Sequence, residues 1–235
     1  MKRNMILYGC LLLLLSSAQC RKENDDNIIL SPVTQSDSSK TYLALGDSYT
    51  IGQSVPATDR FPAQTVALLR GLGIKIKDPQ YIAVTGWTTG DLSNAIGNPS
   101  LTYNVVSLLI GVNDQYQHHD TTGYRQKFLE VLMKAMILAG NNSNNVFVLS
   151  IPDYSVTPFG LNYDTAFIRK QIGQFNHINK EVSLEHNCHY LDITPSTRAA
   201  LTDPELVASD GLHPSGKEYA KWASWLAPMM YNVLK

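Results

Sequence analysis

The feature that most constrains the fold is the alternation of short apolar runs with longer amphipathic segments. From residue 41 onward, five short runs are rich in Val, Ile, Leu and aromatic residues; they span 42–45, 81–84, 104–110, 146–151 and 189–193. Runs of this length and composition are typical of strands buried on both faces of a parallel sheet. We therefore expect five such strands.

Longer segments between these runs carry apolar residues near the helical spacing. They span 61–69, 124–138, 164–184 and 215–234. Strands that alternate with helices predict an α/β fold, a three-layer α/β/α sandwich around a parallel sheet, in one domain over residues 41–235.

Charge and composition narrow the possible functions. The chain has 19 basic and 20 acidic residues, a formal net charge of −1, and no basic stripe along any segment. This balance argues against a nucleic-acid partner. The chain contains neither a Gly-x-Gly-x-x-Gly nor a Walker pattern, so no nucleotide cofactor is expected.

The N-terminus has the pattern of an export signal. Lys2 and Arg3 precede the apolar residues 5–15, a stretch shorter than the roughly 20 residues that span a bilayer. Small residues follow at 16–18, so we predict a secretory signal peptide over 1–19.

Residues 15–20 (LSSAQC) resemble a bacterial lipobox, which implies lipidation of Cys20. Gln19 stands where that motif has a small residue, and the alternative is cleavage after Ala18. We expect an exported lipoprotein, anchored by lipid to the outer membrane or cell surface, on a polar tether over 20–40. The alternative is a periplasmic or secreted protein.

Three polar residues far apart in sequence supply the groups needed for nucleophilic catalysis. Ser48 follows the first apolar run, and Asp210 and His213 lie three positions apart near the end of the chain. A hydroxyl that attacks an ester needs an adjacent base, and that base needs a group to orient it. Gly-Asp-Ser and Asp-Gly are common in turns when each is taken alone. Together with the residues described next, they predict a serine esterase.

Other polar and glycine residues follow the next two strands. Gly86 follows the second apolar run, and residues 111–114 (GVND) follow the third. Ligands of an open parallel sheet bind outside the carboxyl ends of its strands. We therefore expect Ser48, Gly86 and Asn113 to meet at one edge of the sheet.

Four blocks in order carry a family resemblance: residues 46–50 (GDSYT), 85–89 (TGWTT), 111–114 (GVND) and 210–215 (DGLHPS). On these blocks the chain resembles the SGNH hydrolases of the GDSL esterase and lipase family, across residues 41–235. The resemblance implies a flavodoxin-like sheet and no cofactor.

The resemblance also implies roles for individual residues. Ser48 would be the nucleophile, His213 the general base, and Asp210 the group that orients the imidazole. The backbone N–H groups of Ser48 and Gly86 and the side-chain amide of Asn113 would form the oxyanion hole. Asp47 and Asp114 are expected to hold the adjacent loops.

Three other interpretations are disfavoured. The α/β-hydrolase fold places its serine in Gly-x-Ser-x-Gly, whereas position 50 is threonine. The groups around 114–120 and 186–189 lack the spacing of a closed metal site, so no metal is expected. A nucleophilic Cys188 is the third. This residue lies in a strand-like run, which favours a buried structural thiol instead.

Aromatic residues beside the proposed site bear on the substrate. Tyr49 and Trp87 adjoin the proposed serine and oxyanion glycine, where aromatic faces suit sugar rings and acyl chains; either ring could instead pack in the core. We expect O-deacylation, of acetyl esters above all, on small or polymeric carbohydrate. The alternatives are a lipase, lysophospholipase or thioesterase for longer acyl chains, and a non-catalytic glycan-binding surface lipoprotein.

Overall fold

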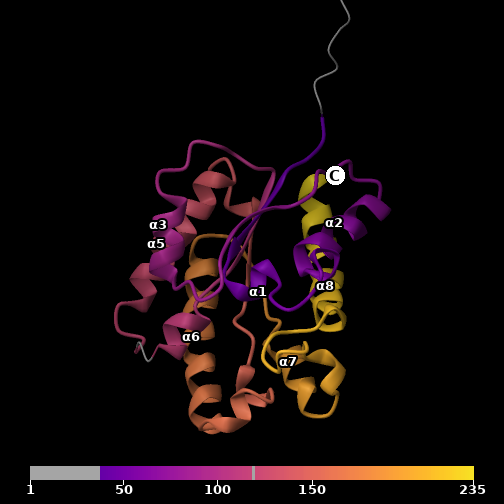
Figure 1. The fold of residues 1–235 in the computed structure, drawn as a ribbon. Helices are drawn as coiled ribbons and strands as arrows, with labels where there is room; N and C mark the ends of the chain where they lie inside the picture. The colour runs from indigo at the N-terminus through magenta and orange to yellow at the C-terminus, as the bar shows by residue number, and fades with distance from the viewer. Residues whose placement is uncertain (1–37, 118–119) are drawn as a thin grey trace, which may run out of the picture. The chain divides into compact units, whose positions relative to one another are not determined.

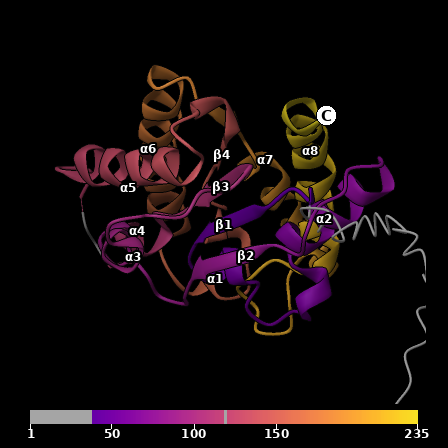
Figure 2. The same ribbon diagram turned by 90° about the horizontal axis from the view of Figure 1, so that it is seen from above.

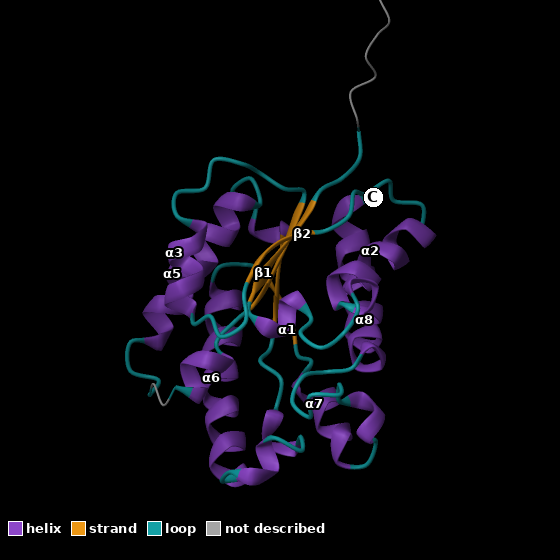
Figure 3. Ribbon diagram, viewed as in Figure 1, coloured by secondary structure: helices purple, strands orange, loops and turns teal. Residues whose placement is uncertain are grey.

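The computed structural model describes residues 38–117 and 120–235, which form a parallel sheet between two layers of helices (Figures 1 and 3). Its strands are β1 (Tyr42–Gly46), β2 (Gln80–Ala83), β3 (Val105–Leu109), β4 (Val146–Leu149) and β5 (His189–Leu191). Neighbouring strands are parallel, in the order β2-β1-β3-β4-β5. Each strand overlaps the run assigned to it from the sequence, although β1 extends one residue further, to Gly46, and β2 begins one residue earlier, at Gln80.

The central strands have no solvent-facing side. Every residue of β1, β3 and β4 is buried, whereas β2 and β5 are partly exposed. Central strands covered by helices on both faces need apolar side chains at every position, and this explains their unbroken apolar runs.

Helices cover both faces of the sheet (Figures 1 and 2). One face carries α2 (Phe61–Gly71) and α8 (Gly216–Leu234), which pack on each other. The other carries α3 (Thr89–Ile96), α5 (Tyr124–Leu138) and α6 (Thr165–Glu185). The predicted three-layer α/β/α fold is confirmed.

Short helical pieces join the main elements. The α-helical ones are α1 (Ser48–Ile51), α4 (Val112–Tyr116) and α7 (Thr194–Thr197). The 3-10 turns are η1 (Ala57–Asp59), η2 (Ser143–Asn145), η3 (Tyr154–Val156), η4 (Gly160–Asn162), η5 (Arg198–Leu201) and η6 (Pro204–Leu206).

The strand order fixes where a ligand can bind. The chain leaves β1 toward the edge strand β2 and later returns to β3 on the other side of β1. In an open parallel sheet the crevice for ligands opens at this switch point, outside the carboxyl ends of the two strands. Helix α1 begins just after β1 and α4 just after β3, so both begin at this crevice.

The described region begins inside the segment that the sequence analysis assigned to a tether. Lys40 forms a parallel bridge with Ile76, directly before β1. The predicted signal peptide, most of the predicted tether and Cys20 lie outside the described residues. Within the described residues, no helix combines the length and apolar character needed to cross a bilayer.

Candidate active site

Ser48 is presented by a tight turn between β1 and α1. Asp47 caps the short helix, because its Oδ1 accepts a hydrogen bond from Tyr49 N at 2.9 Å. Gly46 is required by close packing, since a Cβ there would collide with Thr50 Oγ1 and the carbonyl of Leu109. As the first residue of α1, Ser48 keeps a backbone N–H without an intrahelical partner.

The structure brings the three predicted residues together across 165 positions of sequence. Ser48 Oγ lies 2.9 Å from His213 Nε2, and His213 Nδ1 lies 2.7 Å from Asp210 Oδ2. An ionised carboxylate only accepts hydrogen bonds, so Nδ1 carries the proton and Nε2 accepts from the Ser48 hydroxyl. The arrangement can therefore remove a proton from the serine.

Asp210 is held as a charged acceptor by its surroundings. Its side chain accepts from Ser54 Oγ at 2.7 Å and from the backbone N–H groups of Leu212 and His213 at 2.9 and 3.0 Å. Burial raises the pKa of Asp210, but these bonds, the Ser54 bond foremost, and the imidazole outweigh it and lower the pKa to about 2. A full negative charge therefore faces the imidazole at neutral pH.

Ser54 is a site residue that sequence reasoning missed. It lies in the loop after α1 with a φ of 66°, in the left-handed region that residues with a side chain rarely adopt. This backbone conformation accompanies the hydroxyl's bond to Asp210. A serine in a polar loop carries no sequence signal of its positive φ or of its hydrogen bond to Asp210.

Gly86 and Asn113 line the same pocket as Ser48, as the sequence predicted. Gly86 occupies a turn closed by Trp87 N donating to Val84 O, and its φ of 85° is the positive value that favours glycine. The turn's own bond uses Trp87 N–H and not that of Gly86. Asn113 Nδ2 donates one bond to Trp87 O at 3.0 Å, and an amide nitrogen has a second proton to offer.

Asp114 ties two of these loops together. It is buried, and its carboxylate accepts from Thr89 N at 2.9 Å and from Thr89 Oγ1 at 2.7 Å. This joins the start of α3, just after Gly86, to α4, which carries Asn113. The structural roles expected for Asp47 and Asp114 agree with these bonds.

The serine opens onto a pocket of about 220 Å³. Its lining includes Ser48, Gly86, Asn113 and His213, the aromatic Tyr49, Tyr116, Tyr154 and Phe159, and the apolar Val112 and Leu212. Tyr49 is buried and its ring centroid lies 5.1 Å from that of His213. Trp87 is half-buried and packs against the core, outside the set of side chains that line this pocket.

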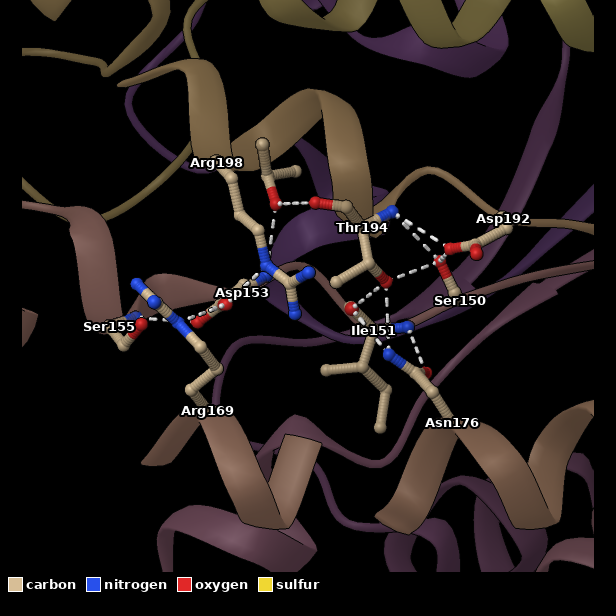
Figure 4. A network of polar contacts seen from close by, with 10 residues as sticks. Ser150, Ile151, Asp153, Ser155, Arg169, Asn176, Asp192, Thr194 and Arg198 are labelled. Atoms are coloured by element: carbon tan, nitrogen blue, oxygen red, sulfur yellow. Dashed lines mark hydrogen bonds and ion pairs between the residues drawn. The ribbon is translucent and has the colours of Figure 1, made fainter. Parts of the chain in front are cut away.

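A polar network anchors the segment that brings Tyr154 to the pocket (Figure 4). Asp153 is fully buried between two arginines, with Arg198 Nε at 2.8 Å and Arg169 Nε at 3.4 Å from its Oδ2. Asn176 exchanges two bonds with the backbone of Ile151, at 2.7 and 2.9 Å. The pocket wall is therefore fixed by charge and hydrogen bonding as well as by packing.

The same network continues between the ends of β4 and β5. The Ser150 hydroxyl accepts from Thr194 Oγ1 at 2.7 Å and donates to Asp192 Oδ1 at 3.0 Å, as Figure 4 shows. Sequence reasoning missed this network, because its members are ordinary polar residues scattered over three segments.

The described residues contain no cluster of three or more His, Cys, Asp or Glu side chains suited to a metal ion. His118 and His119, which belong to the group of polar residues at 114–120, lie outside the described residues. Cys188 is buried, and this burial raises the pKa of its thiol to about 11. The thiol therefore stays protonated at neutral pH, in agreement with a structural role.

A comparison with models of known families identifies one family. The family model described as GDSL-like Lipase/Acylhydrolase matches residues 44–221. No curated protein matches the chain.

Several solved structures share the fold. A lipolytic protein of the G-D-S-L family from Veillonella parvula is 19% identical, with a TM-score of 0.60, over 82% of this chain and 98% of that one. The lipase Lip_vut3 from a goat rumen metagenome is 18% identical, with a TM-score of 0.67, over 84% and 100%. A variant of Axe2, an acetyl xylan esterase from Geobacillus stearothermophilus, is 20% identical, with a TM-score of 0.60, over 81% and 94%.

Proposed function

Since the chain belongs to the GDSL-like lipase/acylhydrolase family and is a carboxylic ester hydrolase, we propose that Ser48, His213 and Asp210 perform its catalysis. One observation carries the proposal. A continuous line of hydrogen bonds runs from Ser48 Oγ through the imidazole to Asp210, at 2.9 and 2.7 Å, beside the pocket.

The reaction proceeds in two halves. Ser48 Oγ bonds to the ester carbonyl carbon while its proton passes to His213 Nε2. The tetrahedral intermediate then collapses, its bond to the alcohol oxygen breaks, and the alcohol takes the proton from Nε2. Water next gives a proton to Nε2 and attacks the acyl-serine, which releases the acid and returns the proton to Ser48.

The proposed oxyanion hole combines the backbone N–H groups of Ser48 and Gly86 with Asn113 Nδ2. The lining of the pocket by these three residues and the free second proton of the Asn113 amide support it. Donors aimed at the carbonyl oxygen are worth most when its negative charge develops.

Asn113→Ala tests this arrangement. We expect kcat to fall by about 10²–10³, with a smaller effect on KM, because the bond strengthens in the transition state. Steady-state kinetics and thermal unfolding should be measured together, since Asn113 also bonds to Trp87 O. A lower Tm with unchanged kcat would assign Asn113 a structural role only.

We propose acetyl or similarly short acyl groups on carbohydrate as the substrate. The pocket, at about 220 Å³, lies below the roughly 300–1,000 Å³ of most ligand sites and so favours a small acyl group. The second candidate is a lipase, lysophospholipase or thioesterase for longer chains, which the apolar Val112 and Leu212 in the lining favour.

Two measurements test these proposals. A serine-directed phosphonate should label the wild type and leave Ser48→Ala unlabelled; no labelling of the wild type would favour a glycan-binding protein without turnover. Hydrolysis of p-nitrophenyl acetate, p-nitrophenyl decanoate and acetylated xylan should then be compared. A strong preference for decanoate would contradict the carbohydrate proposal.

Export and lipid anchoring remain proposals based on residues 1–20 alone. Labelling with radioactive palmitate should mark the wild type and be lost in Cys20→Ala. An unlabelled wild-type protein released into the periplasm or medium would favour the soluble alternative.

A further inference from the structure

Exposed aromatic side chains concentrate around one cavity beside the proposed catalytic pocket. Four aromatic residues are exposed in the described part of the chain: Tyr116, Tyr163, Phe167 and Trp225. The first three line a cavity of about 380 Å³. Exposed apolar rings gathered at one hollow indicate a binding surface.

The cavity adjoins the pocket that holds Ser48. Tyr116 of α4 and Tyr154 of η3 line both hollows, so a ligand in one borders a ligand in the other. The rest of the wall includes Tyr163 and, in the first turn of α6, Phe167. A substrate whose ester lies at Ser48 therefore has a place for its adjoining part.

The walls of this cavity are preorganised. The ring centroids of Tyr116 and Tyr154 are 6.3 Å apart. The Tyr154 hydroxyl donates to Gln115 Oε1 at 2.9 Å, and Gln115 Nε2 donates to Gln171 at 2.8 Å. Fixed rings lose little conformational entropy when a ligand binds.

The lining combines aromatic faces with polar groups. Tyrosine hydroxyls and the exposed Asp164 carboxylate border the same space as the Phe167 ring. Asp164 caps α6 through one oxygen, which accepts from Phe167 N at 3.0 Å. A carboxylate beside a bound alkyl chain is unfavourable because it would lose hydration without gaining a partner. A sugar ring satisfies both features, with C–H groups for the aromatic faces and hydroxyls for the carboxylate.

We propose that this cavity is a glycan subsite, which binds a sugar ring of the alcohol part of the substrate while the acyl group lies at Ser48. The inference rests on the proposed carbohydrate esterase activity. Tyr163 and Phe167 are its specificity-determining residues, since they line this cavity and not the pocket at Ser48.

Tyr163→Ala and Phe167→Ala test the subsite, with Trp225→Ala as the matched control. Trp225 is an exposed ring on α8, which covers the other face of the sheet. For each variant, kcat/KM on acetylated xylan is divided by kcat/KM on p-nitrophenyl acetate. We expect this ratio to fall about 5-fold for each cavity variant, as for the loss of one aromatic contact of roughly 1 kcal/mol. The control should keep the wild-type ratio.

Each contrary outcome has a distinct meaning. Wild-type enzyme that releases no acetate from acetylated xylan overturns the proposed carbohydrate activity and the subsite with it. Wild-type release with cavity variants that match Trp225→Ala overturns the subsite alone. A selective loss on p-nitrophenyl decanoate assigns the cavity to an acyl chain, and this also overturns the proposal.

Discussion

Two carboxylates flank the proposed nucleophile in contrasting surroundings. Asp47 precedes Ser48 in the chain and is fully buried; among the described residues its Oδ2 has no hydrogen-bond partner. Burial raises the pKa of Asp47 to about 8, against the opposing bond from Tyr49 N. Asp210 lies 163 positions after Asp47, is partly open to solvent, and has a pKa lowered to about 2 by its hydrogen bonds.

This contrast shows that the surroundings of each carboxylate decide whether it is ionised, and that its distance from Ser48 in the sequence does not. At neutral pH Asp47 is largely protonated and Asp210 is ionised. The single negative charge therefore lies behind the imidazole, where it would stabilise the cation of the proposed mechanism. A second charge at Asp47 would lie beside the serine, where negative charge also develops in the transition state.

Asp210→Asn should cause the largest loss of kcat among the substitutions of these two carboxylates and their neighbours. The neutral amide can donate as well as accept, so it no longer fixes the proton on Nδ1 and no longer stabilises the imidazolium. We expect kcat to fall by about 10⁴, as for the corresponding change in other Ser-His-Asp enzymes. Steady-state kinetics on p-nitrophenyl acetate would measure it, and a loss below tenfold would remove Asp210 from the mechanism.

Ser54→Gly sharpens the comparison by changing only the environment of Asp210. It removes a hydrogen bond to a charged group, worth about 1.5–3 kcal/mol. We expect kcat/KM to fall about tenfold, because only part of this energy contributes to stabilising the transition state. Without this donor the carboxylate binds the Nδ1 proton more strongly. The acid limb of the kcat/KM profile should therefore move to higher pH.

Glycine at position 54 also separates function from folding. Its backbone adopts the φ of 66° without strain, so any fall in Tm should come from the lost hydrogen bond alone, and turnover by the folded enzyme should fall as well. Asn187→Gly is the matched control, because Asn187 has a φ of 57° and is remote in sequence from the site residues. A lower Tm with unchanged kcat/KM, or an unmoved acid limb, would give Ser54 a structural role only.

The sequence predicts the elements whose pattern is local. Unbroken apolar runs gave the five strands, and the order of the four blocks gave Ser48, Asp210 and His213. Helix α3 was missed, although Thr88 and Asp91 form a capping box that marks its start. Only three of its eight residues are apolar (Leu92, Ala95 and Ile96), too few to mark a helical stripe in the sequence.

What the sequence does not predict depends on tertiary contacts. Ser54 meets Asp210 across 156 positions, and the two arginines that hold Asp153 come from separate helical segments. The aromatic cavity brings together residues of α4 and α6 that no periodic pattern connects. The difference between Asp47 and Asp210 likewise arises from burial and donor number, which appear only when the chain is folded.

Asp47→Asn should have the smallest effect on turnover and the clearest effect on stability. The folded-state pKa of about 8 lies above the ordinary aspartate pKa of 3.8, so between these values the native state binds more protons than the unfolded state. Wild-type stability therefore falls as pH rises from about 5 to 8, by at most about 1.4 kcal/mol per pH unit from this group. Asparagine does not ionise, and its side-chain oxygen can still accept from Tyr49 N. Urea unfolding at several pH values should give a flatter profile for Asp47→Asn, with kcat close to that of the wild type. Parallel profiles for the two proteins would show that Asp47 is ionised in the folded enzyme. A loss of kcat as large as that of Asp210→Asn would show that Asp47 takes part in turnover. Either result would contradict the division of roles between the two carboxylates.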